Sequence, residues 1–120
     1  MRSGDAVPRV DPDATFNELM KQISAKSVGA TAIVSPTNHV LGIFTDGDLR
    51  RLIEKGFDLR QVSAKEVMHT SPRTIRVNEL AAMAAEMMET HSITSILVLD
   101  TDDKLCGIVH ISDLMRAKVI

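Results

Sequence analysis

GIFTDGDLRR, residues 42–51, returns near the end of the chain as GIVHISDLMR, residues 107–116. The two stretches align at one fixed offset, which pairs Gly42 with Gly107 and Asp48 with Asp113. Both begin with an apolar run and end with an acidic residue followed by an apolar-basic pattern. A match of this length at a fixed offset indicates that the chain contains two copies of one supersecondary unit.

The repeat extends upstream of these two stretches. VGATAIV at residues 28–34 falls on ITSILVL at residues 93–99 with the same offset. Nearer the start, Met1 matches Met68, and this offset is larger by two, so the second copy is slightly shorter before its first helix. The repeat therefore covers nearly the whole chain.

The spacing of apolar residues predicts a strand, a helix, two strands and a second helix in each copy. Thr15 and Glu18 form a capping box that starts the first helix. Two β-rich runs, 30–34 and 40–45, flank a turn and predict a hairpin. The fold class is therefore α+β, with two β-α-β-β-α repeats.

We place the repeats at residues 1–60 and 61–120, and a second capping box, Ser63 with Glu66, predicts a connecting helix between them. One copy of about 60 residues leaves one face of its sheet uncovered. We therefore expect the two copies to pack sheet to sheet with pseudo-twofold symmetry, and a ligand cleft to lie between them.

Composition excludes several classes of protein. The chain has 120 residues, 44% of them hydrophobic, and a formal net charge of −2. It has neither the dense basic clusters of nucleic-acid or membrane-surface binders nor an apolar run of the roughly 20 residues that span a bilayer. The N-terminus lacks a signal-peptide pattern, so we expect a cytoplasmic protein. The one cysteine, Cys106, lies in an apolar run and is read as a buried structural thiol.

Catalytic and metal sites find no support in the sequence. The four histidines lack the paired spacing of zinc ligands, and no cysteine cluster accompanies them. Asp46 and Asp48 are close together, but acidic residues are favoured at the start of a helix. We expect a binding module that catalyses nothing, holds no metal and requires no cofactor.

Thr45 and Asp48 are the first candidate ligand-binding residues. Thr45 ends a strand and Asp48 lies in the first turn of the following helix. The hydroxyl and the helix amides favour a phosphate, and the carboxylate suits the hydroxyls of a ribose. The same Thr-x-x-Asp arrangement also caps a helix without any ligand, and the sequence leaves both interpretations open.

The second copy has His110 where the first has Thr45, while Asp113 matches Asp48. The hydroxyl cap is lost, and His110 is a candidate donor to a phosphate or a sugar carboxylate, or else a packed residue without a ligand. The two ends are thus inequivalent, which favours one asymmetric ligand over two identical nucleotides. Further candidates near the expected cleft are Pro8, Arg9, Thr31, Arg73, Thr74, Ile75 and Ser95.

The Gly-Ile-Phe-Thr-x-x-Asp-Leu pattern at the end of each copy resembles the signature of the cystathionine-β-synthase (CBS) domain, which occurs as tandem pairs. IFTDGDLRR, HSITSILV and GIVHISDLMRA are similar to the C-terminal CBS pair of bacterial arabinose 5-phosphate isomerases. The resemblance implies an isomerase domain N-terminal to the pair in a parent enzyme of 3-deoxy-manno-octulosonate (Kdo) and lipopolysaccharide biosynthesis. It also implies association into a homodimer or a higher homo-oligomer.

Three functions follow from this resemblance. The leading hypothesis is feedback sensing of the sugar nucleotide CMP-Kdo, because a phosphodiester, a ribose and a carboxylated sugar match an asymmetric cleft. The alternatives are an adenine-nucleotide (AMP or ATP) sensor and a ligand-free module that holds isomerase subunits together.

Overall fold

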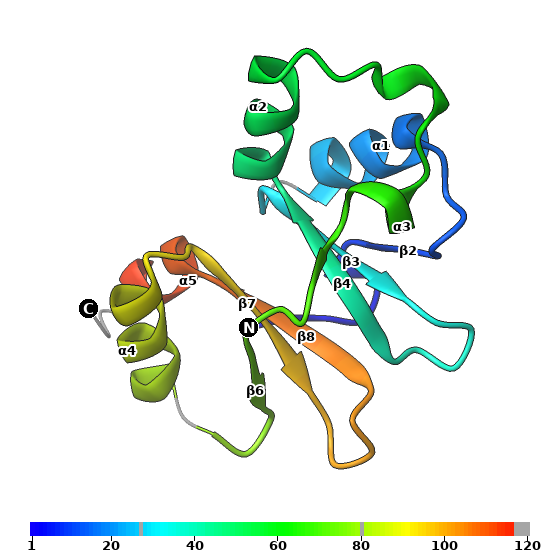
Figure 1. Ribbon diagram of the computed structural model, residues 1–120. Coiled ribbons are helices and arrows are strands. Elements are labelled where there is room, and N and C mark those ends of the chain that lie inside the picture. Colours follow the sequence, from blue (N-terminus) through cyan, green and yellow to red (C-terminus); the bar gives the residue numbers. More distant parts are fainter. Residues whose placement is uncertain (27, 80, 117–120) are drawn as a thin grey trace. The chain divides into compact units, whose positions relative to one another are not determined.

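The computed structural model describes residues 1–26, 28–79 and 81–116 (Figure 1). The described chain divides into two compact units. The β3–β4 unit spans Pro8–Pro72, and the β7–β8 unit joins Met1–Val7 to the described residues from Arg73 onward. Each unit contains one four-stranded sheet and the helices that pack on it, so the fold is α+β as the sequence predicts.

The β3–β4 unit has the strand order β2-β3-β4-β5. Strand β3 runs parallel to β2 and antiparallel to β4, which in turn pairs with β5. Its elements in chain order are β2 (Arg9–Val10), α1 (Phe16–Lys26), β3 (Ala30–Val34), β4 (Val40–Thr45), α2 (Asp46–Glu54), the 3-10 turn η2 (Leu59–Gln61), α3 (Ala64–Val67) and β5 (His69–Thr70).

The β7–β8 unit has the strand order β1-β8-β7-β6 and the same pairing directions. Its elements are β1 (Arg2–Ser3), the 3-10 turn η1 (Gly4–Ala6), β6 (Thr74–Arg76), α4 (Ala81–His91), β7 (Ser95–Leu99), β8 (Leu105–His110) and α5 (Ile111–Arg116). The matching order and directions in the two sheets confirm the internal repeat.

Each sheet contains a fourth strand that the sequence does not predict. Strand β1 comes from the start of the chain, yet it pairs with β8 of the second repeat. Strand β5 follows the connecting helix and pairs back with β4 of the first repeat. Each of these strands passes close to a glycine of the strand beside it. A Cβ on Gly42 would lie 2.8 Å from the carbonyl oxygen of His69 in β5, and a Cβ on Gly107 would lie 2.9 Å from the carbonyl oxygen of Arg2 in β1.

The core of the β3–β4 unit lies between its sheet and its helices. Strands β3 and β4 contribute Ile33 and Phe44, and helix α1 contributes Leu19, all fully buried. The Phe16 ring packs edge-on against Phe44 with centroids 5.9 Å apart. The apolar face predicted for this helix therefore faces the core.

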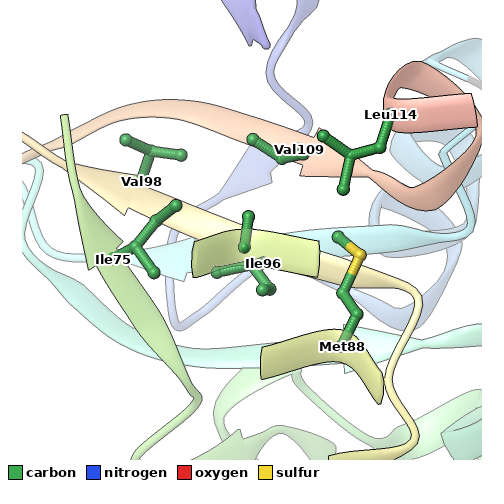
Figure 2. Close-up of a cluster of buried hydrophobic side chains, with 7 residues drawn as sticks. Ile75, Met88, Ile96, Val98, Val109 and Leu114 are labelled. Atoms are coloured by element: carbon green, nitrogen blue, oxygen red, sulfur yellow. The ribbon is translucent and has the colours of Figure 1, made fainter. Parts of the chain in front are cut away.

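The core of the β7–β8 unit is built in the same way (Figure 2). Apolar side chains from β6, β7, β8, α4 and α5 point toward one another; those labelled are Ile75, Met88, Ile96, Val98, Val109 and Leu114. Cys106 is a free thiol that packs against this core and is only half-buried, less than the sequence predicts. Burial, aided by the nearby Asp100 carboxylate, raises the pKa of the thiol.

Candidate functional site

The candidate site begins where β4 passes into α2. Thr45 is the N-cap of α2, and its hydroxyl accepts a hydrogen bond from the Asp48 amide at 3.2 Å. The Asp48 carboxylate accepts in return from the Thr45 amide at 2.9 Å and from the Thr45 hydroxyl at 3.0 Å. This reciprocal arrangement is a capping box, which satisfies amides that a helix N-terminus would otherwise leave unpaired. We call it the Thr45–Asp48 cap.

Asp48 has one more partner in this cap. Its second carboxylate oxygen accepts from the Arg51 guanidinium at 2.6 Å. The side chain of Asp48 is 19% exposed and that of Arg51 57% exposed. Because an ionised carboxylate has about four acceptor positions and three are in use, one hydroxyl group of a ligand can still bind to Asp48 beside these donors.

The equivalent corner between β8 and α5 is built differently. The Asp113 carboxylate accepts from the His110 amide at 3.2 Å, which reproduces half of the capping box. The imidazole Nδ1 of His110 accepts from the Ser112 amide at 3.1 Å and lies 2.7 Å from the Ser112 hydroxyl. The hydroxyl cap is absent, as the sequence predicts, and the imidazole takes over the capping role. We call this arrangement the His110–Asp113 cap.

This hydrogen bond also decides which ring nitrogen of His110 carries the proton. Because Nδ1 accepts from a backbone amide, the neutral ring carries its proton on Nε2. Within the described ranges, Nε2 has no hydrogen-bond partner. The second corner thus offers an N–H donor where the first offers a hydroxyl.

Two arginines surround Asp113. Arg116 of the same helix reaches one carboxylate oxygen at 2.7 Å, and Arg2 of β1 reaches that oxygen at 3.4 Å. Burial of Asp113 favours its neutral form, but the His110 amide and the two guanidinium groups outweigh that effect and lower the pKa of the carboxyl. Asp113 is therefore held as an anion, with three donors around it.

The remaining candidates lie on or next to strands of both sheets. Ser95 of β7 lies directly opposite His110 in the sheet register, so these two belong to one corner. Arg9 of β2 donates to the Asn38 side chain at 2.9 Å, while Pro8, just before that strand, is buried. Thr74 is half-buried at the start of β6, and Arg73 is exposed just before it.

Thr31 and Ile75 belong to the cores. Thr31 shares its face of β3 with Ile33, which packs against the helices, and its hydroxyl is buried with no partner among the residues described. The Ile75 side chain lies in the core drawn in Figure 2. Both side chains therefore lie on the face of their sheet that the helices cover.

Arg2 and Ser112 are residues of the second corner that sequence reasoning missed. The sequence did indicate that Arg2 belongs to the repeat, because the offset that aligns Met1 with Met68 also aligns Arg2 with His69. What it did not reveal is that β1 pairs with the other repeat.

The arrangement fits the comparison of this sequence with protein families. Residues 3–55 and 64–120 each match the model of the CBS domain. The chain belongs to the CBS domain family. Because the two matched repeats fill nearly all of it, the chain is a regulatory CBS pair.

Curated relatives place this CBS pair in a larger enzyme family. It is 41% identical over 120 residues to "Arabinose 5-phosphate isomerase KdsD" of Salmonella typhi, covering all of this chain and 36% of that protein. The match falls in the C-terminal region of the relatives, whose identities range from 36 to 41%. The pair thus spans about a third of the length of these isomerases.

Solved structures agree on the fold. The pair matches the crystal structure of CBSX2 in complex with AMP with a TM-score of 0.82 and 21% identity, covering 99% of this chain and 92% of that one. It matches the CBS domain protein PAE2072 from Pyrobaculum aerophilum, complexed with AMP, with a TM-score of 0.82 and 21% identity, covering 95% and 90%. At this identity the likeness shows the fold alone.

Metal-ligating side chains do not gather in the described part of the chain. In residues 1–26, 28–79 and 81–116, no group of three or more of them comes together. None of the helices in these ranges has the length and apolar character needed to cross a bilayer.

Proposed function

We propose that this CBS pair is the ligand-sensing regulatory part of an arabinose 5-phosphate isomerase, and that it binds a sugar nucleotide such as CMP-Kdo. The observation that carries the proposal is the inequivalence of the two caps. The Thr45–Asp48 cap offers a hydroxyl and a carboxylate, while the His110–Asp113 cap offers an imidazole N–H beside a carboxylate flanked by two arginines.

An asymmetric ligand matches this inequivalence. A ribose diol donates hydrogen bonds to a carboxylate, and the phosphodiester and sugar carboxylate of CMP-Kdo accept them from N–H groups. The relatives support the enzyme family, since they are arabinose 5-phosphate isomerases. The proposal includes an isomerase domain N-terminal to the pair, a homo-oligomeric parent and a cytoplasmic location.

An adenine nucleotide is the second candidate, and the two similar structures in complex with AMP favour it. Those neighbours are only 21% identical to this chain, so the ligand must be tested directly. A pair that serves only to hold subunits together is the third.

Isothermal titration calorimetry of the 120-residue chain with CMP-Kdo, AMP and ATP distinguishes the three. We expect heat with CMP-Kdo and a weaker response with both adenine nucleotides. Binding of AMP or ATP alone would show that the pair senses adenine nucleotides and not the sugar nucleotide. No heat with any of the three compounds would leave only the function of holding isomerase subunits together.

The variants Asp48→Ala and Asp113→Ala test whether the caps contact the ligand. Each removes a cap carboxylate and should weaken binding by about tenfold or more, corresponding to roughly 1.5–3 kcal/mol for a lost charged hydrogen bond. Glu66→Ala is the matched control, because Glu66 closes a capping box on α3 with Ser63 outside the site. Equal affinity of all three variants would confine the caps to a structural role.

A further inference from the structure

Strand β1 is tied to the second cap by one side chain. Arg2 lies opposite Ile108 and Ser3 opposite Gly107, so β1 holds to β8 through only two residues. From this short strand the Arg2 guanidinium reaches the Asp113 carboxylate at 3.4 Å. The side chains are 27% and 15% exposed, so the ion pair is partly shielded from solvent.

In the described part of the first repeat, no ion pair joins the short strand β5 to the cap. His69 of β5 occupies the place of Arg2, since it lies opposite Ile43 as Arg2 lies opposite Ile108. His69 is exposed, and among the residues described it makes no hydrogen bond or ion pair with Asp48. The molecule thus contains its own control, with one cap joined to the neighbouring strand and one not.

The chemistry at Asp113 shows which contact gives way when a ligand binds. One carboxylate oxygen accepts from the His110 amide, and the other is shared by Arg116 at 2.7 Å and Arg2 at 3.4 Å. Two hydroxyl groups of a ribose need acceptor positions on the same carboxylate. Arg2 is the most distant of the three donors, and it alone comes from a strand far away in the sequence.

We infer that ligand hydroxyls on Asp113 displace Arg2, so that occupancy of the second cap loosens β1 from β8. Arg2 is the positioning residue of this device, and the inference rests on the proposed function. Because the chain matches the C-terminal region of longer isomerases, the counterpart of β1 in them follows the rest of the enzyme. A change in β1 is therefore placed to reach that part of the polypeptide.

Hydrogen–deuterium exchange of the backbone amides, followed by NMR, tests the ligand-independent part, because exchange reports local opening. Asp113→Asn and Arg2→His should each speed exchange at residues 2–3 of the 120-residue chain by about two- to fivefold, the range for a partly exposed ion pair. Arg2→Lys should restore part of the protection. Asp48→Asn is the matched control and should leave exchange at residues 69–70 unchanged.

The ligand arm adds CMP-Kdo, with binding followed by calorimetry in the same samples. In the unsubstituted chain CMP-Kdo should speed exchange at residues 2–3, and in Arg2→His it should cause no further rise. If the ligand binds and this exchange is unchanged or slower, the inference is wrong. It is equally wrong if Asp113→Asn and Arg2→His leave β1 protected, whatever the ligand does. An absence of heat with CMP-Kdo would instead contradict the proposed function.

Discussion

Thr31 is a polar residue in an apolar place. Its hydroxyl is fully buried on the helix side of β3 and has no partner in the described part of the chain, while Ile96 holds the same place in the other repeat. An unpaired buried hydroxyl costs about 1–3 kcal/mol, so Thr31→Val, which keeps the shape, should raise the melting temperature by several degrees. Thermal denaturation followed by circular dichroism measures this.

Thr74→Val is a suitable control for that experiment, because Thr74 is only half-buried at the start of β6. It should leave the melting temperature nearly unchanged. A lower melting temperature for Thr31→Val would mean that the hydroxyl has a stabilising partner.

The carboxyl of Asp113 makes stability depend on pH. Burial alone would raise its pKa in the folded chain, but the His110 amide, Arg2 and Arg116 outweigh that effect, and the pKa is lowered. A carboxyl of this kind stabilises the fold above its unfolded pKa of about 3.9, and that contribution is lost as pH falls through the folded value. Asp113→Asn should therefore melt below the unsubstituted chain at neutral pH, with the gap narrowing below about pH 4.

Differential scanning calorimetry of both proteins from neutral to acidic pH measures this gap. Thr74→Val, which removes a neutral hydroxyl that has no hydrogen bond to an ionisable side chain in the described part of the chain, should change the melting temperature little at any pH. A gap for Asp113→Asn that stays constant down to about pH 3 would show that Asp113 is not stabilised as an anion.

Residue spacing was enough to predict the Thr45–Asp48 cap, because a capping box is a contact between neighbours in sequence. The role of His110 was only half predicted. Its position came from the repeat, but the bond from the Ser112 amide to Nδ1 depends on the side-chain conformation. The Arg2–Asp113 ion pair joins opposite ends of the described chain, and no local pattern indicates it.

At the scale of elements, the close approach of β1 to Gly107 and of β5 to Gly42 predicts that neither glycine tolerates a side chain without a loss of stability. A methyl group on Gly42 or Gly107 would meet the backbone of the neighbouring strand at 2.8 or 2.9 Å. Gly42→Ala and Gly107→Ala should each cost about 1–3 kcal/mol, the usual range for overpacking. Urea denaturation at equilibrium measures the free energy of unfolding.

Gly47→Ala is the matched control within α2. Its new methyl group would lie 3.4 Å from the flexible end of Arg51, and alanine is favoured over glycine inside a helix by about 0.5–1 kcal/mol. We expect equal or greater stability for this variant. Full stability of Gly42→Ala and Gly107→Ala would mean that β5 and β1 can move away from the new methyl groups without a loss of stability.

Elements with a strong local signal were predicted well. The hairpin turns form where expected, and Asn38 and Asp103 adopt the left-handed conformation that their residue types tolerate. The connecting helix begins after Ser63 as its capping box predicts. The two-residue strands β1 and β5 are too short for any periodicity, so only the structure reveals them. The expected sheet-to-sheet packing stays a prediction.

At the scale of the whole molecule, residues 1–6 support a unit that is otherwise built from residues after 72. Deleting them should expose the edge of β8 and speed hydrogen exchange at residues 105–110. Residues 30–34 and 40–45 lie in the sheet that keeps all its strands, and their exchange should be unchanged. Exchange measured by mass spectrometry on peptic peptides would show the difference; equal effects on both sheets would mean that the units do not unfold separately.

The pairing of β1 with β8 also has a consequence for synthesis on the ribosome. Arg2 is translated about a hundred residues before Ile108, its partner in the sheet. At about 5–20 residues per second, β1 is synthesised several seconds or more before its partner exists. Although β1 precedes every other strand of its sheet in the sequence, it is therefore among the last of them to pair, and until then it is open to chaperones and proteases.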